Sequence, residues 1–173
     1  MPILTGNQIN KEVNAGQIVI YPFNLSQLNP NSYNLKLGKR LLVYKNFPLD
    51  MRKENEVQEV IIPNEGLYLN PGVLYLGETE EYTETPQHVP HIEGRSSVGR
   101  LGMQVHVTAG FGDTGFCGKW TLEITVVHPL KVYAGTAVCQ IAYSTVLGDI
   151  TPYKGKYSGQ QGAVPSCLFQ DYA

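Results

Sequence analysis

The sequence predicts an all-β protein built as one domain. Gly, Pro and Tyr are abundant, with 18, 11 and 11 copies among 173 residues, and this composition suits a turn-rich β protein better than a helical bundle. Short runs of Val, Ile, Leu, Tyr and Thr recur between turn residues, and several alternate apolar with polar side chains, as half-buried strands do. We expect residues 1–150 to form the domain. Residues 151–173 lack apolar periodicity, and we expect a tail that is either frayed or ordered by a ligand or partner.

A short helix is expected near the N-terminus. Thr5 and Gln8 have the spacing of a capping box, in which the first side chain accepts a hydrogen bond from the backbone of the second. Ile9 and Val13 then lie on one helical face, and the helix is expected to end near Gly16.

Strand candidates occupy most of the chain that follows, and Asn, Gly and Pro residues separate several of them. Gly38 interrupts one candidate, so we expect two strands with a bend there. Residues 46–56 carry a Pro and a mixed-charge run without periodicity, and they are expected to form a surface loop. In chain order the candidates are QIVIYPF (17–23), SYNLKLGKRLLVY (32–44), EVIIP (59–63), GLYLN (66–70), VLYLGETEEY (73–82) and AVCQIAY (137–143).

Two further runs alternate most regularly, with apolar residues on one face of the strand and polar residues on the other. Within residues 103–108 the apolar set is Met103, Val105 and Val107, and the polar set is Gln104, His106 and Thr108. Within residues 119–127 the apolar set is Trp120, Leu122, Ile124 and Val126, and the polar set is Lys119, Thr121, Glu123 and Thr125. A carboxylate in mid-strand commonly faces solvent. If this polar face lines a pocket instead, desolvation would raise the pKa of Glu123 and make it a usable general base.

The stretch HIEGRSSVGRLG, residues 91–102, combines the groups that bind phosphate. Arginine offers a forked guanidinium that matches two oxygens, and Gly-Ser turns offer hydroxyls and backbone N–H groups. The spacing is not that of a Walker loop, which ends in Gly-Lys-Ser/Thr, so a P-loop nucleotidase is disfavoured. A turn that is merely solvated remains the alternative. The residues concerned are Arg95, Ser96, Ser97, Gly99 and Arg100.

Other polar residues complete no catalytic motif of their own. The His and Cys residues lack the H-x-E and P-C-x-x-C spacing of a zinc deaminase, and no G-x-S-x-G elbow of a serine hydrolase is present in the sequence. Asp113, between glycines, suits a turn in which Asp bonds its own backbone. His106 suits a hydrogen-bonded structural role better than a catalytic one.

Charge and cysteine content limit the partners. The net charge is −2 and the isoelectric point is near 6.1, so the chain as a whole has no electrostatic reason to bind nucleic acid or an anionic membrane. The sequence contains neither a signal-peptide pattern nor about 18 consecutive apolar residues. Three widely spaced cysteines suit reduced thiols better than a disulfide framework or a structural zinc site. We expect a cytoplasmic protein without nucleic-acid or membrane partners.

The stretch EGRSSVGRLGMQVHVTAGFGDTGFCGKWTLEI, residues 93–124, closely resembles the core of the dCTP deaminases, a branch of the trimeric dUTPase superfamily. The resemblance extends in order along nearly the whole chain, through LNPNSYNLKLG, NPGVLYLGETEEY, GTAVCQIAY and KYSGQQGAVPS. It implies a distorted jelly-roll or β-barrel of the dUTPase-like type, formed here by residues 1–150, and a homotrimer with each nucleotide site at a subunit interface. Residues 151–173 would be the lid that closes over the site.

The same resemblance implies a role for individual residues. The triphosphate and base would be held by Arg95, Ser96, Ser97 and Arg100, and the 3′-hydroxyl of deoxyribose by Asp113. The pocket would be lined by Thr121, Leu122 and Gln140, and the tail would contribute Tyr153, Lys156 and Gln160. The catalytic group would consist of Glu123, which activates a water, Arg100, and Ser96 with the backbone carbonyl of Ala109, which orient that water.

The activity implied is deamination of dCTP without zinc, in which the activated water attacks C4 of cytosine and ammonia leaves. Mg²⁺ is expected on the triphosphate, without protein ligands of its own. Gly110, in HVTAGFGD, is similar to bifunctional members of the family that also hydrolyse dUTP, so we expect dUMP, pyrophosphate and ammonia as products.

Four alternatives stay open. Two are enzymes: a monofunctional dCTP deaminase that gives dUTP, and a plain dUTPase. The third is a nucleotide-binding regulator that uses dTTP or dUTP as a signal, and the fourth is a carbohydrate-binding β-sandwich, for which a single Trp offers little stacking surface.

Overall fold

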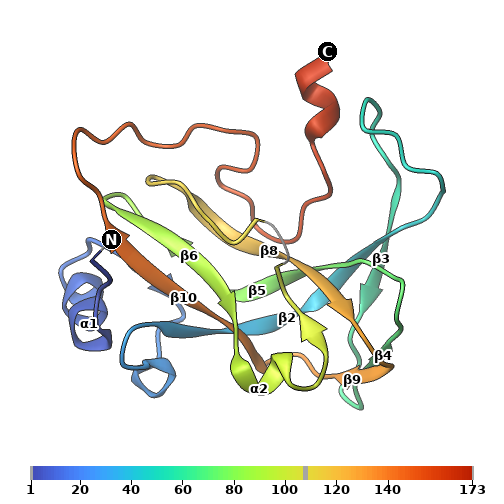
Figure 1. Ribbon diagram of the computed structural model, residues 1–173, viewed down its shortest axis with the longest axis horizontal. Coiled ribbons are helices and arrows are strands. Elements are labelled where there is room, and N and C mark those ends of the chain that lie inside the picture. The colour runs from blue at the N-terminus through green and yellow to red at the C-terminus, as the bar shows by residue number, and fades with distance from the viewer. Residues whose placement is uncertain (1, 107–108, 173) are drawn as a thin grey trace.

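The chain folds into a strongly curved antiparallel sheet that nearly closes into a barrel (Figure 1). The computed structural model describes residues 2–106 and 109–172. The main sheet has the strand order β6-β10-β2-β5-β8-β7, with β1 beside β5 and β3 beside β2, while β4 pairs with β9 in a separate ribbon. The strands are β1 (Val19–Tyr21), β2 (Tyr33–Tyr44), β3 (Val57–Ile61), β4 (Leu67–Leu69), β5 (Tyr75–Glu84), β6 (His88–Gly94), β7 (Met103–Gln104), β8 (Cys117–Val126), β9 (Leu130–Val132) and β10 (Ala137–Thr145). The helices are α1 (Gly6–Asn14), α2 (Ser96–Gly99) and the 3₁₀ helices η1 (Leu25–Gln27) and η2 (Leu168–Tyr172).

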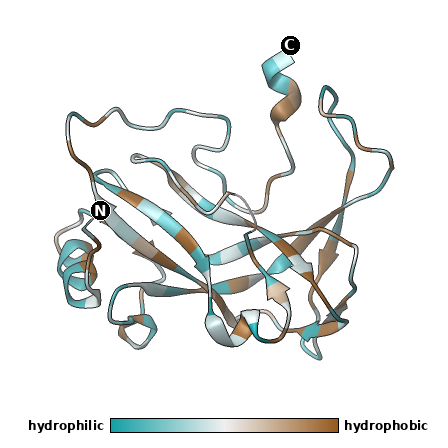
Figure 2. Cartoon of the chain, viewed as in Figure 1, coloured by the Kyte–Doolittle hydropathy of each residue, from teal (hydrophilic) through white to brown (hydrophobic). Residues whose placement is uncertain are grey.

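The expected N-terminal helix is α1. The Thr5 side chain accepts a hydrogen bond from the Gln8 backbone N–H at 3.3 Å, as the capping motif requires. Ile9 is fully buried on the inner face of the helix, whereas most of the other α1 residues are hydrophilic (Figure 2). Gly16 follows the helix with a positive φ of 70°, which glycine adopts without steric cost.

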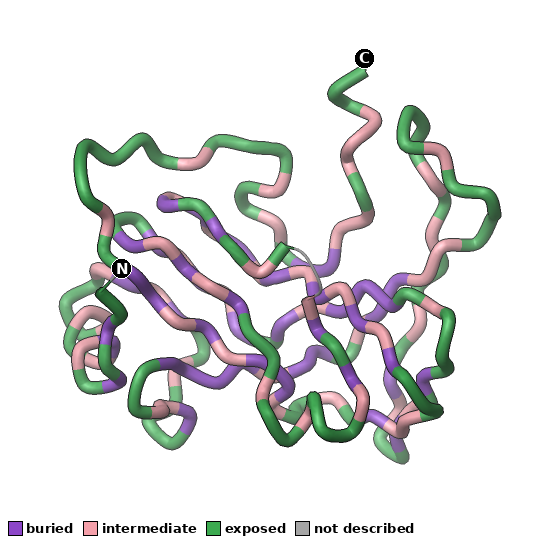
Figure 3. The backbone as a smooth tube through the Cα atoms, in the orientation of Figure 1, coloured by how far each residue is buried: buried purple, intermediate pink, exposed green. Residues whose placement is uncertain are grey.

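The core fills the concave side of the sheet. Burial follows strands β2, β5, β8 and β10, whereas the loop between β2 and β3 and much of the tail are exposed (Figure 3). Full burial of a Leu or Ile side chain contributes about 1.5–3 kcal/mol to stability, so this cluster fixes the strands that carry the site. Its fully buried members include Tyr33, Leu35, Leu37, Leu41, Leu122, Ile124, Ile141 and Tyr143.

The run SYNLKLGKRLLVY forms one continuous strand, β2, so the expectation of two strands with a bend was wrong. The register between β2 and β5 shifts between Leu37 and Leu41, which accommodates the irregularity without ending the strand. Gly38 lies within this shift, and a Cβ at its position would come within 2.7 Å of the Glu78 Cγ. The glycine therefore permits a close approach of β5.

Strand β6 was not expected, because Pro90 interrupts its pattern. Ile92 donates its backbone N–H to Gly110, away from β10, at 2.7 Å. The position of Pro90, two residues earlier, faces the same way, so its missing N–H costs no bond to β10. HIEGRSSVGRLG thus comprises the end of β6, the short helix α2 and the turn before β7.

The alternating run from residue 103 is a strand only at Met103–Gln104 within the described part. Met103 and Val105 are buried, as the alternation predicts. Val107 and Thr108, which were expected to continue the pattern, lie outside the described residues. The loop expected at residues 46–56 is confirmed.

Candidate active site

A cavity of about 580 Å³ lies between strand β8, the loop that precedes it and the C-terminal tail. Figure 1 shows the tail running across the molecule on the side of β8. Five of the expected site side chains and the expected backbone group at Ala109 line it together. They are Ala109, Asp113, Thr121, Glu123, Tyr153 and Gln160.

Strand β8 positions the polar residues by its alternation. Along Cys117–Val126 every second residue is buried and the intervening ones are half-buried. Thr121 and Glu123 therefore project from the same face into the cavity. Leu122 between them is fully buried, so its side chain belongs to the core.

Glu123 lies beside His106, whose imidazole is almost entirely buried. The His106 Nδ1 and Glu123 Oε2 atoms are 3.7 Å apart, and their side chains are 6% and 34% exposed. Hydrogen bonding from His106 is the largest influence on the Glu123 carboxyl and lowers its pKa, desolvation acts in the opposite direction, and the His106 charge lowers the pKa further. The distance of 3.7 Å is nevertheless that of an ion pair rather than of a direct hydrogen bond.

Two expectations change with this pair. Desolvation alone was expected to raise the pKa of Glu123, but the neighbouring imidazole outweighs it and the pKa is lowered. His106 was expected to be a hydrogen-bonded structural residue, yet within the described part of the chain neither of its ring nitrogens has a hydrogen-bond partner. The imidazole lies instead beside the Glu123 carboxylate, which faces the cavity.

Two backbone contacts with β6 hold the loop that carries Ala109 and Asp113. Ile92 donates its N–H to the Gly110 carbonyl at 2.7 Å, and Gly112 donates to the Pro90 carbonyl at 2.9 Å. A Cβ on Gly110 would lie 2.4 Å from the Ile92 oxygen, so a larger residue would force the loop away from β6. The absence of a side chain at Gly110 thus allows the loop to pack closely against β6.

The tail is ordered against the body of its own chain. Gln160 forms a parallel bridge with Gly118, and its carbonyl accepts the Lys119 N–H at 2.9 Å. Thr121 Oγ1 lies 3.3 Å from Gln160 Nε2 and accepts the Val164 N–H at 3.1 Å. Thr121 is therefore a point of attachment for the tail as well as part of the cavity wall.

Lys156 does not line the cavity. Its ammonium forms an ion pair with Asp171 of η2, and the Arg52 guanidinium lies 5.1 Å from the centre of the Tyr172 ring. The end of the tail is thus attached both to itself and to the loop between β2 and β3.

Sequence reasoning missed the aromatic wall of the cavity. Phe116 lies with its ring centre 4.5 Å from that of Trp120 and 6.2 Å from that of Tyr153. Trp120 has the period of a core residue and is buried, so its contribution to the cavity could not be separated from its place in the core. Phe111, Phe116 and Tyr157 come from irregular segments, where periodicity carries no information.

A second group of expected site residues lies elsewhere. Figure 1 shows α2 at the opposite end of the molecule from the tail. The Arg95 guanidinium donates to the Ala137 carbonyl at 2.8 Å, and the Gln140 amide lies beside Gly94. The remaining members are exposed: Ser96, Ser97 and Arg100.

The cavity of one chain is therefore chemically incomplete for an anion. Among its described lining residues the ionisable side chains at neutral pH are Asp113, Glu123 and His106, and none is Lys or Arg. Within residues 2–106 and 109–172 no group of three or more His, Cys, Asp and Glu side chains is placed to hold a metal ion. No helix in the same described segments is long and apolar enough to cross a membrane.

Comparison with known proteins identifies the family of this chain. The family model described as dCTP deaminase-like matches residues 3–146. The chain belongs to the dCTP deaminase-like family. Within that family, proteins named "dCTP deaminase, dUMP-forming" from Leptospira biflexa, Cytophaga hutchinsonii and Clostridium acetobutylicum are 59%, 56% and 56% identical to it over 171 residues, with 98% of each chain covered. An alignment of that length includes most of the tail.

The expected fold is confirmed by a solved structure of the family. The crystal structure of the 2′-deoxycytidine 5′-triphosphate deaminase from Agrobacterium tumefaciens superimposes with a TM-score of 0.66 at 20% identity. The match covers 83% of this chain and 48% of that one, so the chain spans about half the length of that structure.

Proposed function

We propose that this protein deaminates dCTP without zinc and also cleaves the triphosphate, so that dCTP and two waters give dUMP, pyrophosphate and ammonia. The observation that carries the proposal is the half-buried Glu123 carboxylate in a cavity walled by aromatic rings. Relatives at 56–59% identity bear the name dCTP deaminase, dUMP-forming, which supports both the substrate and the product.

Glu123 is the general base of the proposed reaction. Its lowered pKa keeps the carboxyl ionised at neutral pH, so it can accept a proton from water as the oxygen attacks C4 of cytosine. Glu123 then returns the proton to the tetrahedral intermediate, the bond between C4 and the amino nitrogen breaks, ammonia leaves, and the base becomes uracil. Ala109, which borders the same cavity, would orient the water through its carbonyl oxygen.

The phosphates require residues from a second subunit. A triphosphate carries several negative charges, and the described cavity wall offers neither Lys nor Arg. We propose a homotrimer in which Arg95, Ser96, Ser97 and Arg100 of one subunit meet the cavity of the next, with Ser96 and Arg100 completing the catalytic group. Gln140 borders the same turn, and Mg²⁺ would be held by the phosphate oxygens and water.

Asp113 and the tail complete the assignment. Asp113 lines the cavity and would bind the deoxyribose hydroxyl, while Tyr153 and Gln160 lie where a nucleotide would be covered. Lys156 would have to leave Asp171 in order to reach a phosphate. Gly110, together with the names of the relatives, supports cleavage of the triphosphate and hence dUTP as a further ligand. Three free thiols suit a reducing compartment, and we place the reaction in the cytoplasm.

Substitution Glu123→Gln tests the assignment. The amide keeps the shape of the side chain but cannot accept the proton, so we expect kcat for ammonia release to fall by about 10²- to 10⁴-fold, the usual contribution of a general base. Nucleotide binding, measured by calorimetry, should persist. Retained deamination would refute Glu123 as the base.

Product analysis with dCTP and Mg²⁺ separates the alternatives. We expect dUMP and pyrophosphate from the unmodified protein. Accumulation of dUTP would indicate a monofunctional deaminase, turnover of dUTP alone a dUTPase, and saturable binding of dUTP or dTTP without ammonia release a regulator.

A further inference from the structure

Gln140 lies on strand β10, next to the turn that carries Arg95. A hydrogen bond from Ser32, which precedes β2, determines the orientation of its side-chain amide. We propose that Ser32 is a positioning residue, which holds the Gln140 amide so that its NH₂ group faces a phosphate bound at the turn after β6. The inference rests on the proposed function only in taking that turn as the part that meets the triphosphate.

The cross-strand register brings the relevant residues into one row. Gln140 on β10 pairs with Asn34 on β2 and with Glu93 on β6, so the three side chains project from the same face. Gly94 and Arg95 follow Glu93 directly. The Gln140 side chain is therefore anchored next to the start of α2.

Ser32 acts on Gln140 through the single proton of its hydroxyl. Ser32 Oγ donates to Gln140 Oε1 at 2.8 Å, and Asn29 Nδ2 donates to the same Ser32 Oγ at 3.0 Å. A hydroxyl has one donor and two acceptor positions. Asn29 uses one of the acceptor positions, and Gln140 Oε1 is the acceptor of the Ser32 proton among the described residues.

Asn34 holds Asn29 in the required orientation. Asn29 Nδ2 also donates to Asn34 Oδ1 at 2.9 Å, while Asn34 Nδ2 faces Asn29 Oδ1 at 3.4 Å. The two amides are thus matched end to end. If either amide turned round, two donors or two acceptors would meet.

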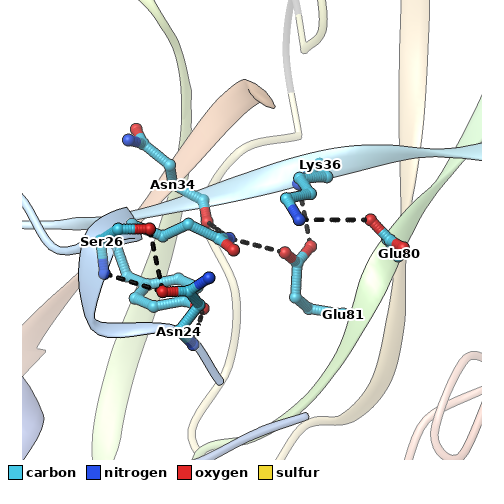
Figure 4. A network of polar contacts seen from close by, with 8 residues as sticks. Asn24, Ser26, Asn34, Lys36, Glu80 and Glu81 are labelled. Atoms are coloured by element: carbon cyan, nitrogen blue, oxygen red, sulfur yellow. Dashed lines mark hydrogen bonds and ion pairs between the residues drawn. The ribbon is translucent and has the colours of Figure 1, made fainter. Parts of the chain in front are cut away.

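A buried carboxylate anchors Asn34 in turn (Figure 4). Gln27 Nε2 donates to both the Asn34 carbonyl and Glu81 Oε1, each at 2.7 Å, and Glu81 Oε2 accepts the Lys36 N–H at 2.8 Å. Glu81 is only 1% exposed. These bonds fix the backbone of β2 at Asn34, the residue that pairs with Gln140 across the sheet.

The orientation matters because the two ends of an amide have opposite polarity. The NH₂ group donates to a phosphate oxygen, whereas the carbonyl oxygen would repel it. With Oε1 bound to Ser32, Nε2 faces the Gly94 carbonyl at 3.5 Å, a distance at which a hydrogen bond is weak. The NH₂ group thus retains donor capacity for a ligand.

Substitution Ser32→Ala tests the inference. Without the hydroxyl the Gln140 amide can turn round, and we expect the affinity for inorganic tripolyphosphate, measured by calorimetry, to fall about 3- to 10-fold, within the range of the net contribution of one ordinary hydrogen bond. The KM for dCTP should rise by the same factor with kcat nearly unchanged. The control is Ser26→Ala, which removes an exposed serine hydroxyl that donates only to Asn24 and should leave both values unchanged.

A double-mutant cycle separates positioning from general loss of structure. In a Gln140→Ala background, Ser32→Ala should have no further effect on tripolyphosphate binding, because no amide is left to orient. An undiminished effect of Ser32→Ala in that background would overturn the inference, as would unaltered affinity in a folded Ser32→Ala protein.

A second variant covers the case in which Ser32→Ala fails to fold. Asn29→Asp keeps the shape of the side chain but replaces the donor with an acceptor, which attracts the Ser32 proton away from Gln140. It should weaken tripolyphosphate binding as Ser32→Ala does, and unchanged binding would contradict the inference. Since the measurements of tripolyphosphate binding need no turnover, absence of dCTP deamination would refute the proposed function alone.

Discussion

At the scale of single residues, the contact between Glu123 and His106 determines whether the carboxyl group in the cavity is ionised. Burial alone would favour the protonated carboxyl, which cannot accept a proton from water. The adjacent imidazole reverses that preference and lowers the pKa of Glu123. In the proposed reaction His106 would act through the carboxylate, so we regard it as a positioning residue.

Substitution His106→Asn should move the acid limb of the pH profile of kcat. In the unmodified protein we expect that limb below the ordinary Glu value of 4.5, because the pKa is lowered. In the variant the imidazole and its charge are lost, so desolvation outweighs what remains, the pKa rises, and activity is lost at a higher pH as acid is added. Ammonia release measured across pH checks this, with the exposed His128→Asn as the matched control. An acid limb at the same pH in both variants would contradict the role of His106.

At the scale of the element, strand β8 and the tail form one unit. The tail adds a short parallel bridge beside Gly118 and covers the face from which Thr121 and Glu123 project. Gly118 has a φ of 142°, and a Cβ there would meet the Gln160 carbonyl at 2.7 Å. The tail approaches so closely because glycine stands at that point.

Substitution Gln160→Ala should loosen this unit without unfolding the barrel. Gln160 Nε2 donates to the Lys119 carbonyl and lies within hydrogen-bond distance of Thr121 Oγ1. At about 1 kcal/mol net for each bond, we expect KM for dCTP to rise about 10-fold or more, with faster proteolysis of the tail and little change in Tm. The neighbouring Gln161→Ala removes only a contact with the Gly159 carbonyl and serves as control. Equal effects of the two variants would argue against a specific role of Gln160 in closure.

Elements with a regular period were predictable from sequence, and the others were not. The alternation in β8 predicted which side chains are buried, because a strand places successive residues on opposite faces. Strand β6 escaped prediction because Pro90 is tolerated only where its missing N–H points away from β10, and that depends on a partner strand distant in the chain. The tail has no period of its own, since its order comes from bonds to β8.

At the scale of the whole molecule, the expected site residues form two groups in one chain. The resemblance to the family named both groups, but nothing in the spacing of Arg95 and Glu123 indicates that they lie apart within one subunit. The aromatic wall was likewise beyond prediction, since Phe116 and Tyr153 meet only after the tail has folded back. The separation supports the proposed sharing of sites between subunits, under which activity would depend on the oligomeric state.

Mixing two inactive variants tests for shared sites. Glu123→Gln lacks the base and Arg100→Ala lacks an exposed cation, yet a site formed from the intact half of each would be complete. After joint refolding in equal amounts, we expect about a quarter of the unmodified activity, since half of the subunits supply each half of a site. Refolding each variant alone is the control. A mixture no more active than its components would show that each chain forms its own site.

The alternation of β8 also limits how the length of this chain can change. Adding or removing one residue within Cys117–Val126 would exchange the core face and the cavity face of every residue beyond that point. Glu123 would then point into the apolar interior and Leu122 or Ile124 into the cavity. A substitution along this strand changes one position, whereas an insertion or deletion that no bulge takes up changes the face of every residue that follows. We expect changes in length to be tolerated best in segments such as the loop of residues 45–56, where an added residue displaces no other from its face.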